Sequence, residues 1–417
     1  MSTPVDSTEP IERARAHRVH DVVIVGAGPA GSSLATLLAQ RGVDVVVLEK
    51  EHFPRFHIGE SLLPAGCVLH ERLGLEPDPD VFVWKGGAEF RCEATGRRQV
   101  FRFDEALPGP PRSAWQVERA TFDTALRDCA VRAGAVVRHG EKVRGVAIDG
   151  DRARVTTDSG EVHARYLVDA TGQDRLLARK ARAVVPYKRF GKAAVFTHFD
   201  GLSRDALDEI GPGNEIRVLV RPGGWGWAIP LPGARLSVGI VTQAQGVDEG
   251  LFDAAFADSP IVRAWTAGAE RRETRVVRNF SYKNSAPHGA RYAAIGDAAC
   301  FLDPVFSSGV ALAMIAAEQL ALRLVPALAA GTEADPALAA GVSAHLERGY
   351  ATFGSLIDRF YNSRFADTVF LSDSEDSLMR RGVVSLLGGD AWRDDNPFQD
   401  MLLRARRRPA PGEAAAS

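Results

Sequence analysis

The chain has 417 residues, of which 45% are hydrophobic and 25% charged, and its formal net charge is −2. This is the composition of an ordinary soluble globular protein, and the balanced charge gives no reason to expect a nucleic acid or an anionic membrane as partner. At roughly 150 residues per domain, two or three structural units are expected.

The cysteines are too scattered to form a metal site or a disulfide framework. No C-x-x-C pair occurs, which is typical of a reducing compartment, so we expect a cytoplasmic protein without a bound metal. The opening residues, MSTPVDSTEPIERARAHRVH, lack the apolar core of a signal peptide. The sequence contains no run of 18 apolar residues, so no membrane-spanning helix is predicted. The cysteines are Cys67, Cys92, Cys129 and Cys300.

The first predicted unit is DVVIVGAGPAGSSLATLLAQRGVDVVVLEK, residues 21–50. A buried strand leads into a G-x-G-x-x-G turn, a helix follows, and a second buried strand ends in an acidic residue. Such glycines permit a tight turn and close approach to a pyrophosphate, and the helix N-terminus faces the phosphates. The pattern predicts a dinucleotide site without separating FAD from NAD. Its predicted cofactor-binding residues are Gly26, Gly28, Ala30, Gly31, Glu49 and Lys50.

Two later segments favour a flavin. Residues 164–172, ARYLVDATG, predict a strand that ends in Asp169-Ala-Thr-Gly, and residues 291–314 carry a strand followed by Gly296-Asp297. Asp297 is placed to accept hydrogen bonds from a flavin ribityl chain. Beyond it, Ser307-Ser308-Gly309 opens a long helix, whose N-terminal amides favour an anion or an electron-rich atom.

This arrangement resembles the FAD-dependent aromatic hydroxylase fold, in which the FAD domain is discontinuous. Gln116 and Arg119, in WQVERATFD, match the Q-x-x-R of that fold, whose arginine lies near the flavin chain. The alternative for Arg119 is a helix-surface charge paired with Glu118 or Asp123. The sequence has no second G-x-G-x-x-G motif that follows a predicted strand, so no separate nicotinamide domain is expected. The resemblance implies four further FAD-binding residues: Arg119, Asp297, Pro304 and Gly309.

Three other segments resemble the flavin-dependent halogenases. They are RFHIGESLLP (residues 55–64), FVWKGGAEF (residues 82–90) and GWGWAIP (residues 224–230). The resemblance covers roughly residues 20–325 and implies that Lys85 is the catalytic residue. Alone, Lys85 would be interpreted as a surface lysine in a Trp-Lys-Gly-Gly turn. The loop implied to lie beside the flavin contains Ile58, Gly59, Glu60 and Ser61.

The halogenase resemblance also implies the chemistry. In that family, reduced FAD and oxygen oxidise a halide to hypohalous acid, which travels through a channel to the substrate. Lys85 would then direct this electrophile through a hydrogen bond or a haloamine. Backbone amides at Ser308 and Gly309 would bind chloride or bromide, the alternative being plain helix capping by Ser307 or Ser308. A separate flavin reductase would supply FADH2.

The stretch RPGGWGWAIPLPG, residues 221–233, holds two of the six tryptophans of the chain. The period-two alternation of a strand puts Trp225, Trp227 and Ile229 on one face. Bulky core packing is the simplest interpretation of that face. Together with the halogenase resemblance, Trp225, Trp227, Ile229 and Pro230 are instead predicted to separate flavin from substrate and so to exclude hydroxylation.

One departure from the family narrows the substrate. Halogenases of free tryptophan carry a glutamate two residues before the position of Ser308, where this chain has Phe306. The departure fits the branch that acts on electron-rich phenols or pyrroles, often tethered to carrier proteins, in secondary metabolism such as antibiotic biosynthesis. The alternatives are an FAD-dependent aromatic monooxygenase that uses NAD(P)H and a catalytically silent flavoprotein.

The predicted fold is α/β. A discontinuous Rossmann-like FAD-binding domain takes residues 20–80, 114–184 and 286–328, and an antiparallel substrate sheet takes 81–113 and 185–285. A helical C-terminal region covers 329–403, between a disordered segment at 1–19 and a flexible tail at 404–417. The helical region carries an aromatic and apolar stripe, which is core or caps the substrate cavity: Tyr350, Phe353, Ile357, Phe360 and Tyr361.

Overall fold

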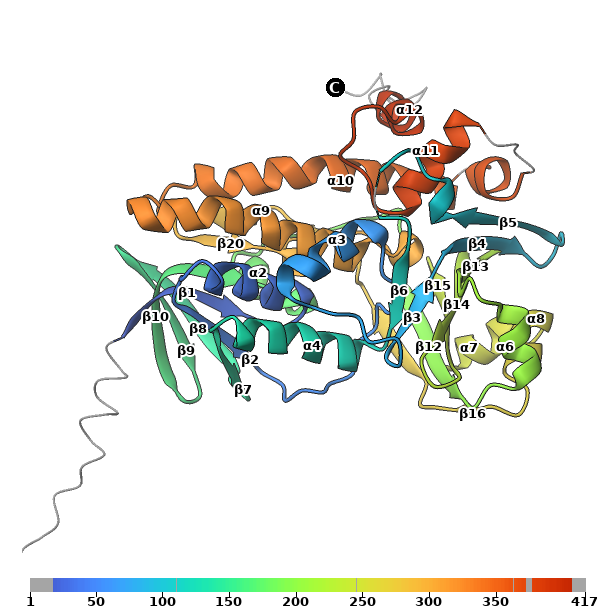
Figure 1. The fold of residues 1–417 in the computed structure, drawn as a ribbon, viewed down its shortest axis with the longest axis horizontal. Coiled ribbons are helices and arrows are strands. Elements are labelled where there is room, and N and C mark those ends of the chain that lie inside the picture. Colours follow the sequence, from blue (N-terminus) through green and yellow to red (C-terminus); the bar gives the residue numbers. More distant parts are fainter. Residues whose placement is uncertain (1–17, 110, 245, 363, 373–376, 407–417) are drawn as a thin grey trace, which may run out of the picture.

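The computed structural model describes residues 18–109, 111–244, 246–362, 364–372 and 377–406 (Figure 1). Both predicted terminal segments are too long at their inner ends, and residues 1–17 and 407–417 lie outside the described chain. Val19 already opens a strand, and the Arg18 guanidinium donates to the Asp44 carboxylate at 2.9 Å. At the other end, helix α12 (Pro397–Arg406) includes Arg404 because the helix is anchored by buried Leu402.

A mainly parallel sheet forms one half of the molecule, with the bounds β1 (Val19–Val25), β2 (Val45–Glu49), β7 (Val136–His139), β8 (Val143–Asp149), β9 (Arg152–Thr157), β10 (Gly160–Asp169), β19 (His288–Gly289) and β20 (Tyr292–Ala294). Its order is β19-β20-β10-β1-β2-β7, and the β8-β9 hairpin extends β10. Val22, Val23 and Ile24 on the central strand are fully buried. Helices pack on one face of this sheet and the β8-β9 hairpin on the other, so the central strands are buried on both faces and carry unbroken apolar runs.

Five helices pack on or near this sheet: α2 (Pro29–Ala39), α3 (Pro64–Leu73), α4 (Arg119–Arg132), α5 (Leu176–Lys180) and α9 (Ser308–Ala330). Helix α2 lies between α4 and α9 (Figure 1). By length and composition alone α9 is able to cross a membrane, yet 50% of its apolar window is buried inside the protein. Leu320 and Leu324 on it are fully buried. Helix α9 is therefore a core helix, as the sequence predicts.

The second large sheet comprises β4 (Gly87–Cys92), β5 (Arg97–Arg102), β12 (Ala193–Asp200), β13 (Ile216–Arg221), β14 (Gly224–Leu231), β15 (Arg235–Thr242), β16 (Glu270–Arg271) and β17 (Arg275–Arg278). Its order is β16-β12-β15-β14-β13-β4-β5, with β17 beside β12. The pairs are antiparallel, as predicted, except that β13 runs parallel to β4. Three short helices pack near this sheet: α6 (Arg204–Ile210), α7 (Gly250–Phe256) and α8 (Pro260–Trp265).

Short elements connect the two halves. The ladder of β3 (Phe82–Lys85) with β6 (Ala114–Val117) and the sheet of β11 (Val184–Pro186), β18 (Tyr282–Asn284) and β21 (Cys300–Phe301) are separate from both large sheets. 3₁₀ turns occur at Phe103–Glu105 (η1), Gly172–Asp174 (η2), Gly296–Ala298 (η3) and Pro304–Phe306 (η4).

The C-terminal region is helical, as predicted, and contains α10 (Ala337–Asn362), the π-helical turn η5 (Ala366–Phe370), α11 (Leu378–Leu387) and α12. Helix α10 packs along α9, and α11 lies against β5 (Figure 1). Phe370 stacks on Phe90 of β4 with ring centroids 4.2 Å apart, and Phe306 joins this cluster at 5.7 Å from Phe370. The region thus covers the end of α9 that carries the predicted halide segment.

Candidate active site

The described residues enclose a cavity of about 550 Å³ between the carboxyl ends of the parallel strands and the face of β12 and β14. Ligands of open α/β sheets bind at this kind of position, outside the carboxyl ends of the strands. The walls come from the glycine-rich turn, the 55–61 loop, η2, η3, the start of α9 and β14. Segments far apart in the sequence therefore meet at one site.

The glycine-rich turn can be built only with glycine at two of its positions. A Cβ on Gly31 would lie 1.9 Å from the Gly26 carbonyl oxygen, and one on Gly26 would lie 2.4 Å from the Ala170 carbonyl oxygen. Gly28 differs, since a Cβ there would meet only the Arg55 guanidinium, at 3.6 Å. Gly26, Gly28 and Ala30 line the cavity, whereas Gly31 packs beneath it.

The acidic end of β2 lies at the same turn. The Glu49 carboxylate accepts a hydrogen bond from the Ala27 amide at 2.8 Å and lines the cavity while 5% exposed. Lys50, beside it, also lines the cavity and pairs with Asp174 at 2.5 Å. Both residues therefore lie where the sequence predicted contacts with the cofactor.

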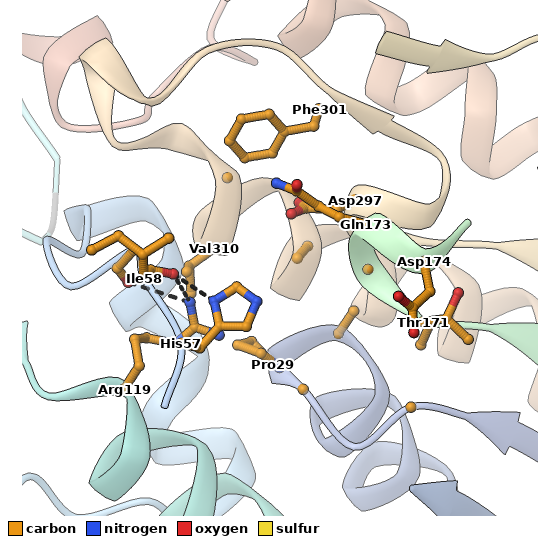
Figure 2. Close-up of a pocket in the computed structure, with 18 of the residues that line it drawn as sticks. Pro29, His57, Ile58, Arg119, Thr171, Gln173, Asp174, Asp297, Phe301 and Val310 are labelled. Atoms are coloured by element: carbon orange, nitrogen blue, oxygen red, sulfur yellow. Dashed lines mark hydrogen bonds between the residues drawn. The ribbon is translucent and has the colours of Figure 1, made fainter. Parts of the chain in front are cut away.

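Arg119 forms a buried ion pair at the cavity wall. Its guanidinium donates to both oxygens of Asp123, at 2.8 and 2.9 Å, and to the Ile58 carbonyl at 2.8 Å (Figure 2). Burial opposes the charge of Asp123, but Arg119 and Arg55 hold the pKa of that carboxyl below its usual range. The pairing with Asp123 that the sequence offered as an alternative is present. It is buried rather than on a helix surface, and it leaves Arg119 in the cavity lining.

His57 contributes a neutral ring to this wall. Its Nδ1 lies 2.6 Å from the Ile58 carbonyl oxygen, beside the Arg119 contact (Figure 2). Burial lowers the pKa of His57 to about 4, and the positive charge of Arg119 acts in the same direction. The ring is therefore uncharged at neutral pH, which no local sequence pattern predicts.

Asp297 projects into the cavity from η3, beside Gln173 (Figure 2). Burial raises the pKa of Asp297 to about 6, and this rise is opposed by Arg119 and by a hydrogen bond with Gln173. The structure adds Gln173, Asp174 and Phe301 to the lining, none of which was predicted. The first two directly follow the Asp-Ala-Thr-Gly motif, which was the available signal.

The predicted halide segment begins a helix of 23 residues, and its capping residue makes no side-chain hydrogen bond. Ser307 takes the left-handed conformation, with φ of +55°. The alternative, in which a serine side chain caps the helix, is therefore wrong. Ser307, Gly309 and Val310 line the cavity, while the Ser308 side chain is buried away from it. The first amides of a helix lack intrahelical partners, so they remain suited to an anion.

The two tryptophans of β14 lie side by side, as their spacing predicted. Their ring centroids are 5.8 Å apart, and both rings line the cavity together with Ile229. The Trp227 indole N–H donates to Ser237 at 3.1 Å, and the Trp225 indole N–H donates to Tyr361 at 2.9 Å. Pro230 belongs to the same strand but is not part of the cavity lining.

Lys85 is buried, so the interpretation as a surface lysine in a turn is wrong. It is 1% exposed, and its ammonium donates to the Leu62 carbonyl at 2.8 Å. The nitrogen lies 5.3 Å from the centroid of the Phe103 ring. Burial lowers the pKa of Lys85 to about 7. Lys85 is not among the residues that line the large cavity.

A second cavity, of about 300 Å³, has Phe103 in its wall, and the ring of Phe103 is also the one that Lys85 faces. The cavity is open to solvent between α3, η1, α9, α10 and the segment that follows α11. His345 and Trp392 in its wall are stacked, with centroids 5.3 Å apart and planes 6° apart. Sequence reasoning missed this cavity because its walls come from five separate segments.

The residues of the large cavity fit FAD. Glu60 is 1% exposed and pairs with His198 at 2.7 Å, but its other oxygen, Oε2, has no hydrogen-bond partner among the described residues. The same holds for the Ser61 hydroxyl. Buried polar atoms without partners are costly, so these two indicate a polar ligand in the cavity. The glycine-rich turn suits the pyrophosphate of a flavin dinucleotide, Glu49 suits its ribose, and Asp297 suits its ribityl chain.

Known proteins resemble this chain in sequence and in fold. The sequence profile of the tryptophan halogenase family matches residues 21–108 and 93–382. The 1H-pyrrole-2-carbonyl peptidyl-carrier-protein chlorinase of Pseudomonas fluorescens is 29% identical over 411 residues, which cover 89% of this chain and 90% of the relative. The corresponding brominase of Pseudoalteromonas luteoviolacea is 33% identical over 317 residues, which cover 71% and 74%.

A solved structure extends the likeness to the fold. The flavin-dependent brominase Bmp2 superposes with a TM-score of 0.79 at 27% identity, covering 93% of this chain and 98% of the brominase. The fold, the residues that line the large cavity and the family profile thus lead to one conclusion. The chain belongs to the tryptophan halogenase family and is an FAD-dependent halogenase that uses a halide in secondary metabolism.

Proposed function

We propose that this enzyme halogenates a pyrrole ring carried as a thioester on a carrier protein. Two relatives named for that substrate support the proposal, and one of them matches over nearly its whole length. Phe306, in place of the glutamate of free-tryptophan halogenases, is consistent with it. We also propose that a separate cytoplasmic flavin reductase delivers the FADH2.

The large cavity would hold the cofactor. Gly26, Gly28 and the N-terminus of α2 would face the pyrophosphate, Glu49 the ribose, and Asp297 the ribityl chain. When bound, reduced FAD activates oxygen for the oxidation of a halide to hypohalous acid. The amides of Ser308 and Gly309 would hold that halide, and the loop at 58–61 would lie against the ring.

Lys85 carries the proposal, because its two contacts lead toward both cavities: Leu62 follows the loop that lines the large one, and Phe103 lines the second. Its nitrogen is held by the Leu62 carbonyl, next to the loop beside the flavin site, and it faces the Phe103 ring in the wall of the second cavity. A pKa of about 7 leaves both ammonium and amine populated at neutral pH. The ammonium would donate a hydrogen bond to hypohalous acid, or the amine would form a haloamine. We place the acceptor ring in the second cavity.

The test is a reconstituted reaction with FAD, a flavin reductase, NADH and bromide. Carrier-bound pyrrole, free pyrrole and an activated phenol are supplied in parallel, and mass spectrometry follows the bromine isotope doublet. We expect brominated carrier-bound pyrrole and little product from the free rings. Bromination of the phenol alone would reject the tethered substrate, whereas an added oxygen without bromine would favour a monooxygenase.

The matched variant for the same assay is Lys85→Ala. General acid–base groups contribute typically 10²- to 10⁴-fold to rate, so product should fall by at least about a hundredfold. FAD should stay bound, because Lys85 does not line the FAD cavity; flavin absorbance after gel filtration checks this. Halogenation at the wild-type rate would remove Lys85 from the proposed mechanism.

A further inference from the structure

A chain of hydrogen bonds connects helix α10 to the wall of the FAD cavity. The Trp225 indole N–H on β14 donates to the Tyr361 hydroxyl on α10 at 2.9 Å. That hydroxyl donates to the Asp303 carboxylate at 3.0 Å. Trp225 is 1% exposed and Asp303 is 2% exposed, so these bonds lie in a setting where lost partners are not replaced freely by water.

Asp303 in turn fixes the backbone that leads into α9. Its Oδ1 accepts a hydrogen bond from the Val305 amide at 3.0 Å, and its Oδ2 accepts one from the Gly191 amide at 2.9 Å. Burial raises the pKa of Asp303 to about 6, against the effect of these donors. The turn η4 that Asp303 caps ends at Phe306, directly before Ser307 and the first amides of α9.

The Gly191 backbone lies close to the Tyr361 hydroxyl and the Asp303 carboxylate. A Cβ on Gly191 would lie 2.8 Å from this oxygen and 2.6 Å from Asp303 Oδ2. The Tyr361 ring packs against Phe360, with centroids 5.7 Å apart, and phenylalanine could provide the same packing. What only tyrosine provides is one group that accepts from an indole and donates to a carboxylate.

We propose that Tyr361 is a positioning residue for halide oxidation. Its hydroxyl orients the Trp225 indole and, through Asp303, holds the turn that presents the Ser308 and Gly309 amides to the halide. This inference rests on the proposed roles of Trp225 and of those amides. It assigns a function in the active site to α10, whose aromatic stripe is otherwise ordinary core.

The test compares Tyr361→Phe with Tyr350→Phe. Tyr350 lies on the same helix, and its buried hydroxyl has no hydrogen-bond partner among the described residues, so its removal is the matched control. For Tyr361→Phe we expect the KM for bromide to rise about two- to tenfold, the effect of one lost hydrogen bond, while kcat at saturating bromide changes less. More of the NADH consumed should appear as hydrogen peroxide. Tyr350→Phe should match the wild type in both measurements.

A double-mutant cycle tests the route of the effect. Adding Tyr361→Phe to Trp225→Phe should cost less than it does in the wild type, because the indole donor is already absent. Equal costs in both backgrounds would overturn the connection through Trp225. An unchanged bromide KM and an unchanged peroxide yield in Tyr361→Phe would overturn the proposal as a whole.

Two further measurements need no turnover. In the wild type labelled with 15N-tryptophan, the indole N–H of Trp225, assigned by its loss in Trp225→Phe, should exchange slowly with solvent. Fast exchange would overturn the hydrogen bond on which the proposal depends, even if Tyr361→Phe does not fold.

Bromide should raise the melting temperature of the FAD-loaded wild type more than that of Tyr361→Phe, and equal shifts would contradict the inference. A wild type that binds bromide but brominates nothing would count against the proposed function alone.

Discussion

At the scale of single residues, burial decides the chemistry of Lys85. A lysine in water has a pKa near 10.5, and the apolar site of Lys85 lowers this pKa to about 7. Its hydrogen-bond acceptor is the neutral Leu62 carbonyl. Since a carbonyl compensates a buried positive charge only in part, the proton becomes easy to lose. The pKa of Lys85 therefore lies near neutral pH, where the side chain would act.

This lowered pKa predicts how stability depends on pH. Between about pH 7 and 10.5 the unfolded chain holds a proton on Lys85 that the folded chain has released, so the free energy of unfolding rises with pH in this window. Lys85→Met removes the contribution. We expect the melting temperature of the wild type, measured relative to Lys85→Met, to increase from pH 7 to pH 9. A constant difference across these values would mean that Lys85 keeps its usual pKa.

At the scale of elements, the β14 strand and the glycine-rich turn each use close packing for a different purpose. On β14, alternation presents Trp225 and Trp227 to the cavity, where their rings are fixed by hydrogen bonds to Tyr361 and Ser237. At the turn, the missing side chain of Gly31 lets the start of α2 approach β1. The tryptophans of β14 fill space beside the cavity for the cofactor, whereas the glycines of the turn leave space open.

The β14 face predicts the outcome of widening the wall. In the variant with both Trp225→Ala and Trp227→Ala, an aromatic substrate would reach the flavin, and some product should carry an added oxygen. Mass spectrometry of the product from carrier-bound pyrrole measures this. The variant must bind FAD and keep a cooperative melt. Under those conditions, a complete lack of oxygenated product would show that the tryptophans do not exclude hydroxylation.

The glycine-rich turn predicts two distinct failures. Gly31→Ala places a Cβ 1.9 Å from the Gly26 carbonyl, so it should lower the melting temperature of the apoprotein and abolish FAD binding. In Gly28→Ala the nearest atom lies at 3.6 Å, on a flexible arginine, so the fold should survive while FAD binds more weakly. Thermal melts with and without FAD separate the two. Equal melting temperatures for both apoproteins would contradict the difference in packing.

At the scale of the whole molecule, the proposed function divides the reaction between two cavities. The large one lies between the two sheets, and the smaller one lies between α3, η1, α9 and the C-terminal helices. Phe103 lines the smaller cavity, and Lys85 contacts both its ring and the Leu62 carbonyl, directly after the loop that lines the large cavity. This division allows oxidant and acceptor to be held apart, which a single shared pocket does not.

Filling the second cavity should therefore separate two activities. Ala106→Trp introduces a large ring into that wall, and halogenation of carrier-bound pyrrole should fall by at least about tenfold, as expected when an aromatic ring loses its site. Oxidation of bromide, followed with a small non-aromatic β-diketone that traps hypobromous acid, should continue. Val185→Trp, at an exposed position on β11, is the control for the added ring. An equal loss of both activities would place the acceptor elsewhere.

Local patterns were sufficient for the flavin half of the protein. Gly26, Gly28 and Gly31 follow a buried strand and open a helix, so backbone sterics alone require the observed turn. The period of two on β14 likewise fixed the face that Trp225 and Trp227 share. The resemblance to halogenases then singled out Lys85, although its neighbours in sequence suggested a surface turn.

Tertiary structure decided everything that depends on contacts between distant segments. The pKa of Lys85 follows from burial beside α3 and η1, and the pairs of Glu60 with His198 and of Tyr361 with Trp225 join residues more than a hundred positions apart. The second cavity is lined by five separate segments. No local pattern encodes such contacts, because each segment obeys its own periodicity whatever it packs against. The sequence by itself determined the family and the turn that fits FAD, whereas only the folded chain determined which distant residues contact one another in the site.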